Sequence, residues 1–295
     1  MMKKIIVNIF VIFLSLPIWS CEKDNFDYNY PPEYVQKLRA RYDDITLDIA
    51  YSSLNDNCPI NTLEHFEAAV QYGFNALKTD LRLTKDGALV LCHDPGFTLN
   101  SEGRIISYDE KNHRKIHDMT LNEVISLEHD AFHEQLGYYA HPTTLKAFLE
   151  LCVQNNVIPY ITIRNEYEDE TVTIIKSLLE SYNLTDRAII NNYPPSVNTC
   201  NEIRRKLPYI SICYTKGNGI PITKDIINIV DALGNAVLCI QRDRLQEMSE
   251  SIWEYSRKKG IRIYGCEIRE KADYDLFIAK GCKGFQIQRK EVISK

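Results

Sequence analysis

The pattern of hydrophobic and polar positions predicts a parallel α/β fold. Beyond residue 43, short apolar runs alternate with amphipathic stretches of helical period, which is typical of strands joined by crossover helices. The expected strands are Ile45–Ala50, Ala76–Arg82, Ala88–His93, Pro159–Arg164, Ala188–Tyr193, Ile210–Thr215, Ala236–Gln241, Ile261–Glu267 and Gly284–Gln288. The clearest helical patterns between them are Leu63–Tyr72, Leu145–Gln154, Val172–Tyr182, Val197–Leu207 and Gln246–Lys259.

One of these strands cannot be a parallel member of the sheet. Only Thr84-Lys85-Asp86-Gly87 joins the second expected strand to the third. Parallel neighbours need a crossover of about a dozen residues or more, so this pair must form an antiparallel hairpin over residues 81–93. Its return strand ends at His93, which is thereby brought to the rim of the barrel that the other strands form. The other eight strands predict a single (β/α)8 TIM barrel, in which enzyme sites lie at the C-terminal strand ends.

Residues 96–140 interrupt the alternation of strands and helices. They contain one amphipathic piece, Leu121–Glu128, and histidines at positions 113, 117, 129 and 133. Because these histidines are spread through a polar stretch rich in Glu and Asp, we expect them to be solvated and not bound to a metal.

The first twenty residues are expected to be a lipoprotein signal peptide. Two lysines precede the apolar run Ile5–Ile18, which at roughly 14 residues is shorter than the about 20 that span a bilayer. The run ends at Ser20-Cys21, and a small residue before a cysteine resembles a lipobox. We therefore expect a mature chain that begins at a lipidated Cys21 and is anchored to a membrane of the cell envelope. The alternative is an ordinary secretory signal followed by a coincidental cysteine.

Residues 21–43 are expected to be a tether between the anchor and a barrel at residues 44–295. The acidic segment Glu22–Asp27 resembles the surface-export signals of Bacteroidetes lipoproteins, which implies an outer-membrane, surface-exposed location. The pair Pro31-Pro32 keeps the following stretch extended.

Charge and cysteine usage exclude some classes of function. The 295 residues carry a formal net charge of −5, with no Lys/Arg-rich stripe, so there is no electrostatic case for nucleic-acid binding. The nine cysteines form neither a CxxC pair nor a Cys/His cluster with zinc spacing. Most lie in apolar strand or helix patterns, so we expect buried free thiols, although one or two disulfides remain an alternative.

Five short motifs carry a resemblance to a known family. They are Pro59-Ile60-Asn61-Thr62-Leu63, Gly73-Phe74-Asn75-Ala76-Leu77-Lys78-Thr79-Asp80, Leu83-Thr84-Lys85-Asp86-Gly87, His93-Asp94 and Pro142-Thr143-Thr144-Leu145. In the same order, they resemble the P-E-N-T-L, G-A-D-x-x-E-x-D, L-T-K-D-G, H-D and I-P-T-L motifs of the glycerophosphodiester phosphodiesterases. The resemblance covers about residues 44 to 290.

This resemblance implies a TIM barrel of the phospholipase C-like phosphodiesterase type, with a role in lipid and glycerophosphodiester metabolism. In that family, three carboxylates hold a divalent cation against the phosphodiester. Two histidines transfer a proton, and an arginine and a lysine hold the phosphate.

Several residues of the family's site are replaced in this chain. The A-H-R-G motif falls on Ala50-Tyr51-Ser52-Ser53, so Tyr51 stands for the first histidine and Ser52 for the phosphate-binding arginine. Ile60 stands for the glutamate of P-E-N-T. The E-x-K strand end falls on Thr162-Ile163-Arg164, which removes a carboxylate and exchanges lysine for arginine. His93 is kept as the second histidine.

The second strand end carries the most informative replacement. Its glutamate has become Lys78, and Asp80 alone remains of the carboxylates. Ca²⁺ or Mg²⁺ needs about six oxygen ligands, so we expect no cofactor unless the family's metal-dependent activity is retained. Side chains two residues apart share one face of a strand, so Lys78 is expected to occupy the cation position and pair with Asp80.

Three hypotheses about function remain. In the first, the barrel is a pseudoenzyme that binds a glycerophosphodiester or another phosphorylated or polar ligand at the cell envelope. In the second, it is a metal-independent phosphodiesterase. In the third, it is a surface interaction module without a small ligand. Phospholipases C specific for phosphatidylinositol give a precedent for a basic side chain in place of a metal. The catalytic hypothesis assigns Lys78 to the role of the cation, Arg164 and Arg82 to the phosphate, His93 to the general acid, and Glu267 or Tyr51 to the base.

Overall fold

The computed structural model describes residues 45–51, 54, 58–107, 114–164, 169–216 and 219–293. The signal peptide, Cys21 and the tether lie outside these residues, so their assignment stays a prediction. In the described part of the chain, no helix is both long and apolar enough to cross a membrane.

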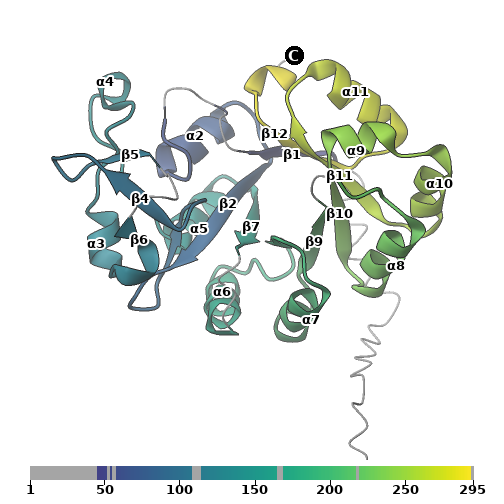
Figure 1. Ribbon diagram of the computed structural model, residues 1–295, viewed down its shortest axis with the longest axis horizontal. Helices are drawn as coiled ribbons and strands as arrows, with labels where there is room; N and C mark the ends of the chain where they lie inside the picture. Colours follow the sequence, from purple (N-terminus) through teal and green to yellow (C-terminus); the bar gives the residue numbers. More distant parts are fainter. Residues whose placement is uncertain are drawn as a thin grey trace, which may run out of the picture.

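Eight parallel strands close into a barrel, which confirms the predicted architecture (Figure 1). The ring closes because β1 pairs with both β2 and β12. The strands are β1 Leu47–Ala50, β2 Ala76–Leu83, β7 Ile158–Ile163, β8 Ile189–Asn192, β9 Ser211–Lys216, β10 Ala236–Gln241, β11 Arg262–Ile268 and β12 Gly284–Ile287. The barrel interior is a packed core, and Tyr160, Cys213 and Tyr264 are fully buried in it.

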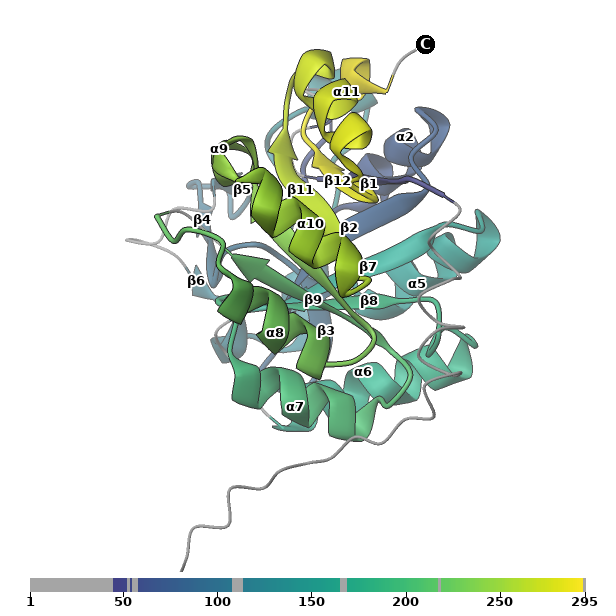
Figure 2. The ribbon, with the colours of Figure 1, turned by 90° about the vertical axis from the view of Figure 1, so that its right-hand side faces the viewer.

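Helices cover the outside of the barrel, and α7, α8, α10 and α11 face the viewer in Figure 2. Their bounds are α2 Leu63–Gln71, α5 Leu145–Gln154, α6 Asp169–Ser181, α7 Val197–Lys206, α8 Lys224–Ala232, α9 Arg242–Glu247, α10 Glu250–Lys258 and α11 Lys271–Lys280, with a final turn η2 Lys290–Val292. The prediction of one continuous helix over Gln246–Lys259 is wrong. The backbone of Met248 is extended, with ψ 121°, and α10 begins anew after Ser249.

The hairpin prediction is confirmed. Strand β3, Leu89–Leu91, runs antiparallel to β2, with Leu81 opposite Leu91 and Leu83 opposite Leu89. Gly87 provides the left-handed residue of the turn, with φ +79°. The amide of Cys92 then donates to the carbonyl of Asp80, which places the next residue, His93, at the rim.

Residues 96–140 contain more structure than the sequence suggested. Their described parts form an antiparallel sheet in the order β5-β4-β6, which lies beside β2 in Figure 1. An apolar cluster that includes Phe97, Ile105 and Met119 holds it together. The elements are β4 Gly96–Leu99, β5 Ile105–Ser107, β6 Arg114–Lys115, η1 Ile116–Asp118, α3 Leu121–Ile125 and α4 His133–Leu136.

One histidine of this region corrects a prediction. His129 is buried and not solvated, because its chain segment bridges to Ile105 and its amide donates to the carbonyl of Ala140. Burial lowers its pKa to about 4. His117 is exposed as expected, and His113 lies outside the described residues.

The cysteines of the described residues match the expectation. All eight, from Cys58 to Cys282, are buried free thiols. Three of them, Cys213, Cys239 and Cys266, lie on the neighbouring strands β9, β10 and β11 and fill part of the barrel interior.

Candidate functional site

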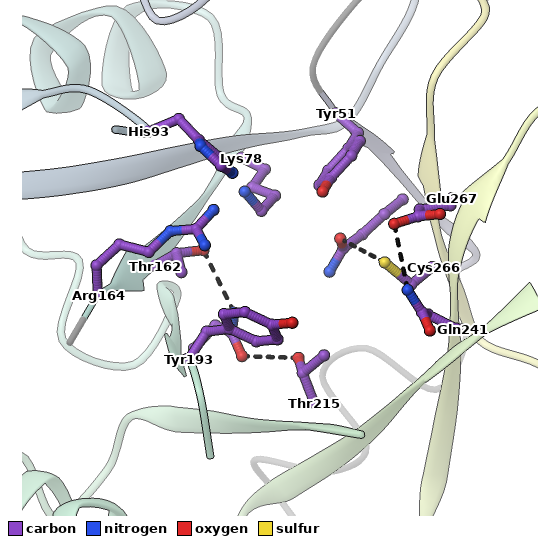
Figure 3. A pocket seen from close by; sticks show the side chains of 12 residues that line it. Tyr51, Lys78, His93, Thr162, Arg164, Tyr193, Thr215, Gln241, Cys266 and Glu267 are labelled. Carbon is purple, nitrogen blue, oxygen red and sulfur yellow. Dashed lines mark hydrogen bonds between the residues drawn. The ribbon is translucent and has the colours of Figure 1, made fainter. Parts of the chain in front are cut away.

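A cavity of about 370 Å³ opens at the C-terminal ends of the barrel strands (Figure 3). This is the end of a TIM barrel where enzyme sites are found. Its lining residues come from every strand of the barrel and from the hairpin: Tyr51, Lys78, His93, Thr162, Arg164, Asn191, Tyr193, Thr215, Gln241, Cys266, Glu267 and Gln286. The structure thus brings together five of the residues predicted for the site: Tyr51, Lys78, His93, Arg164 and Glu267.

A buried cluster of three charged side chains forms one side of the cavity. Lys78 Nζ lies 2.8 Å from Asp80 Oδ2, which confirms the predicted ion pair. Arg164, directly after the neighbouring strand β7, contacts the other oxygen, with Nε at 2.8 Å and a terminal nitrogen at 2.7 Å. The exposed fractions of the three side chains are 7% for Lys78, 5% for Asp80 and 15% for Arg164. Both oxygens of the carboxylate are therefore engaged by cations.

The electrostatics of this cluster favour the charged form of Asp80. Burial alone would raise the pKa of this carboxyl. The nearby charges of Lys78 and Arg164, with a smaller effect of His93, outweigh burial and hold the pKa below its usual value. The cluster therefore contains two positive charges and one negative charge.

Two tyrosines flank the cations. Lys78 Nζ lies 4.7 Å from the centre of the Tyr51 ring, and Arg164 Cζ lies 5.3 Å from the centre of the Tyr193 ring. Both distances are within the range of cation–π contacts. Burial raises the pKa of Tyr51, and the nearby Cys266 and Asp80 raise it further. Its hydroxyl therefore keeps its proton at neutral pH, which argues against Tyr51 as a general base.

His93 lies on the same side of the cavity as Lys78 and Arg164 (Figure 3). Its Nδ1 is 3.0 Å from Asp94 Oδ1, and 39% of the side chain is exposed. A carboxylate at one ring nitrogen orients the ring and leaves the other nitrogen for a proton transfer. Arg82 does not line the cavity, and its guanidinium donates instead to the carbonyl of His93 over 2.6 Å. It therefore supports the position of His93, and its role at the phosphate stays a prediction.

The opposite side of the cavity carries a carboxylate and two amides. Gln241 Nε2 donates to Glu267 Oε1 over 3.3 Å, and Cys266 Sγ donates to Gln286 Oε1 over 3.2 Å. Figure 3 shows Glu267, Cys266 and Gln241 together, across the cavity from Lys78 and Arg164. The cavity is therefore polarised, with cations on one side and a carboxylate on the other.

Sequence reasoning missed several lining residues, which are Asn191, Tyr193, Thr215, Gln241 and Gln286. Thr215 Oγ1 donates to Asn191 Oδ1 over 2.8 Å, so part of the cavity wall is an ordered polar surface. Each missed residue falls within the last three positions of a predicted strand. Polar side chains at that position are the signal that would have found them, since strand ends form the site in this fold.

The donor set does not fit the divalent cation that the family resemblance implies. Both oxygens of Asp80 are already bonded to cationic side chains, and Ile60 has no ligating atom. Within the described ranges, no group of three or more His, Cys, Asp or Glu side chains could hold a metal ion. Ser52 lies outside these ranges. The side chains that line this part of the cavity therefore fit an anion better than a cation.

Comparisons with known proteins agree with the fold and with the motifs. The profile of the glycerophosphoryl diester phosphodiesterase family matches residues 53–231. A glycerophosphodiester phosphodiesterase of Caldanaerobacter subterraneus subsp. tengcongensis is 29% identical over 245 residues, which cover 81% of this chain and 92% of that protein.

Solved structures resemble the barrel at lower sequence identity. A phosphodiesterase of Oleispira antarctica, in complex with the product sn-glycerol-3-phosphate, has a TM-score of 0.70 at 17% identity and covers 85% of this chain and 96% of its own. A glycerophosphodiester phosphodiesterase of Agrobacterium tumefaciens has a TM-score of 0.66 at 18% identity, with 84% of this chain and 98% of its own covered. Since the family profile matches more than half of its length, the chain belongs to the glycerophosphoryl diester phosphodiesterase family.

Proposed function

We propose that the barrel mouth binds a small phosphate ester without a metal ion, with Lys78 and Arg164 as the anion contacts. The observation that carries this proposal is the distance of 2.8 Å between Lys78 Nζ and Asp80, at the strand end where the family holds its cation. An ammonium group in that position supplies positive charge, so no metal ligands are required there.

Spare hydrogen-bond donors support the proposal. Lys78 uses one of its three N–H groups on Asp80, and Arg164 uses Nε and one terminal nitrogen, so both retain donors for a second anion. An arginine fork suits phosphate geometry, and a lysine contributes a compact point charge. The cavity volume of about 370 Å³ is within the range of small-ligand sites, which is about 300–1,000 Å³.

An open cavity also favours a ligand over an interaction module without one. A module would need no polar cavity at the strand ends, and an apolar side chain could close the mouth. Instead Lys78, Arg164 and His93 all line the open space, and Ile60 does not.

The binding proposal is tested by calorimetric titration with sn-glycerol 3-phosphate in excess EDTA. We expect binding that is unchanged by the chelator and about tenfold or more weaker in Lys78→Met, which removes the charge but keeps the chain length. Lys146→Met is the matched control, because Lys146 pairs with Glu150 on the exposed face of α5, away from the cavity. Binding that requires added Ca²⁺ or Mg²⁺ would refute the proposal.

A second candidate function is metal-independent phosphodiester cleavage, which the contact between His93 and Asp94 favours. In this mechanism His93 would protonate the leaving alkoxide, Lys78 and Arg164 would neutralise the phosphate, and Glu267 would accept a proton from the attacking water. Hydrolysis of glycerophosphodiesters and lysophospholipids in EDTA, lost in His93→Ala, would support it. If the native chain in EDTA shows no more turnover than His93→Ala, only the binding function remains.

We further propose that Cys21 anchors the barrel to the cell envelope, at the outer membrane and on its surface. The support is the sequence pattern before and after this cysteine. Mass spectrometry of the mature N-terminus tests it together with fractionation of a Cys21→Ser variant. We expect an acylated Cys21 in the native chain and release of the variant from the membrane. An unmodified N-terminus at another residue would exclude the anchor.

A further inference from the structure

The backbone of Glu267 departs from the regular geometry of its strand. Its φ is +60°, in the left-handed region that non-glycine residues rarely adopt. Between the pairs Gly265–Phe285 and Ile268–Ile287, β11 advances three residues while β12 advances two, so β11 contains a bulge at this point.

The bulge has a clear consequence for the cavity. In a regular strand, successive side chains point to opposite faces, so only one of Cys266 and Glu267 could face the barrel mouth. Both line the cavity, and Figure 3 shows both beside Gln241. The irregular backbone therefore adds a carboxylate to a site that already has its full set of strand-end residues.

Glu267 is held there at a cost in stability. A non-glycine residue in the left-handed region is strained, and such residues cluster at functional sites. Gln241 turns its Nε2 toward Glu267, and this leaves Gln241 Oε1 buried without a hydrogen-bond partner among the described residues. The left-handed backbone of Glu267 and the unpaired Oε1 of Gln241 are thus two unfavourable features that accompany the placement of this carboxylate in the cavity.

No cationic side chain in the part of the chain that the structure describes forms an ion pair with this carboxylate. The two arginines that share an adjoining pocket with Glu267 are engaged elsewhere. Arg242 pairs with Asp243 and Asp273, and Arg269 donates to Gln288. Glu267 therefore faces the cavity as a negative charge that has an amide, but no cation, as its partner.

We infer that Glu267 is an ammonium-binding group, and that the ligand of the cavity is a zwitterionic phosphate ester with an amine on its alcohol side. This inference rests on the proposed anion site: the phosphate contacts Lys78 and Arg164, and the amine contacts Glu267 across the cavity. A carboxylate that binds an ammonium group cannot also accept a proton from water, so this role replaces that of a general base.

Matched pairs of ligands test this inference by calorimetry in EDTA. The probes are 2-aminoethyl phosphate against ethyl phosphate, and 4-aminobutyl phosphate against butyl phosphate, with 2-hydroxyethyl phosphate as a neutral polar control. We expect at least one amine to bind about tenfold more tightly than its alkyl partner and than the hydroxyl control.

The variant Glu267→Gln keeps the shape of the side chain and removes its charge. We expect it to lose the preference for the amine and to bind the alkyl phosphates at least as tightly as the native chain, since a negative charge has left the cavity. Glu254→Gln is the matched control, because it makes the same change of charge on the exposed face of α10. It should retain the preference.

The outcomes separate the two proposals. Equal affinity for amine and alkyl phosphates would overturn the ammonium site and leave the anion site intact. A hydroxyl probe that binds as tightly as the amine would also overturn it, because recognition would then not depend on charge. Failure of every phosphate to bind would overturn both proposals.

Discussion

Asp80→Asn distinguishes a charge cluster from a metal site, because the two predict opposite effects on stability. The substitution keeps the size of the side chain and removes the negative charge between Lys78 and Arg164. Removing one partner of a buried ion pair costs about 3–5 kcal/mol, since an uncompensated charge remains. The value applies here because all three side chains are largely buried.

This free energy corresponds to a lower melting temperature. For a domain of about 250 residues, 1 kcal/mol shifts the melting temperature by about 2–4 °C, so Asp80→Asn should melt roughly 6–20 °C below the native chain. Phosphate should partly restore stability, because an anion can replace the missing carboxylate between the two cations. At a phosphate concentration about 100 times its Kd, the gain would be about 2.7 kcal/mol.

The assay is thermal unfolding in EDTA, with and without inorganic phosphate. Asp275→Asn is the control, because Asp275 and Lys271 form an exposed i,i+4 pair that contributes only about 0.3–0.5 kcal/mol. Phosphate should stabilise Asp80→Asn more than this control. If Asp80 were a metal ligand among other carboxylates, its neutralisation would relieve repulsion in the metal-free protein. A melting temperature equal to or above that of the native chain would therefore refute the charge cluster.

Three further predictions concern the pH dependence of Asp80, the packing at Gly284 and the backbone of Glu267. Because the pKa of Asp80 is depressed in the folded state, its contribution to stability is present above the unfolded pKa of about 4 and is lost as the pH falls through the folded value. In urea titrations, the difference between native and Asp80→Asn should shrink below about pH 5, and a constant difference would contradict this. Gly284→Ala should cost about 1–3 kcal/mol, because the added Cβ would lie 2.8 Å from the buried ring of Tyr264, and an unchanged urea midpoint would exclude that clash. Glu267→Gly should melt at a higher temperature than Glu267→Gln, since glycine relieves the left-handed strain by about 1 kcal/mol, and the reverse order would contradict strain at this residue.

The barrel could be predicted from the sequence because each strand is a local pattern. Period, turn chemistry and loop length placed β10 at its observed bounds and identified the hairpin between β2 and β3. The sheet of β4, β5 and β6 could not be found in this way. Its strands are two to four residues long, and their partners are fixed by an apolar cluster that includes Phe97 and Ile116.

The features of the site also divide into those that a local sequence pattern predicts and those that it does not. The pair of Lys78 and Asp80 follows from two positions on one strand, and it was predicted. Arg164 joins it from a position 84 residues away, directly after the next barrel strand β7, and no pattern within either strand indicates this contact. The bulge at Glu267 has no local signal at all, because a glutamate in the left-handed region is held by its surroundings and not by its own preference.

The central claim is that cationic side chains, and not a metal ion, hold the phosphate in this member of the family. A crystal structure grown with sn-glycerol 3-phosphate and excess Ca²⁺, with anomalous data to locate calcium, tests it most directly. We predict phosphate oxygens within hydrogen-bonding distance of Lys78 Nζ and the Arg164 guanidinium, with no calcium at Asp80. A calcium ion coordinated by Asp80, with Lys78 displaced and the phosphate bound to the ion, would contradict the claim.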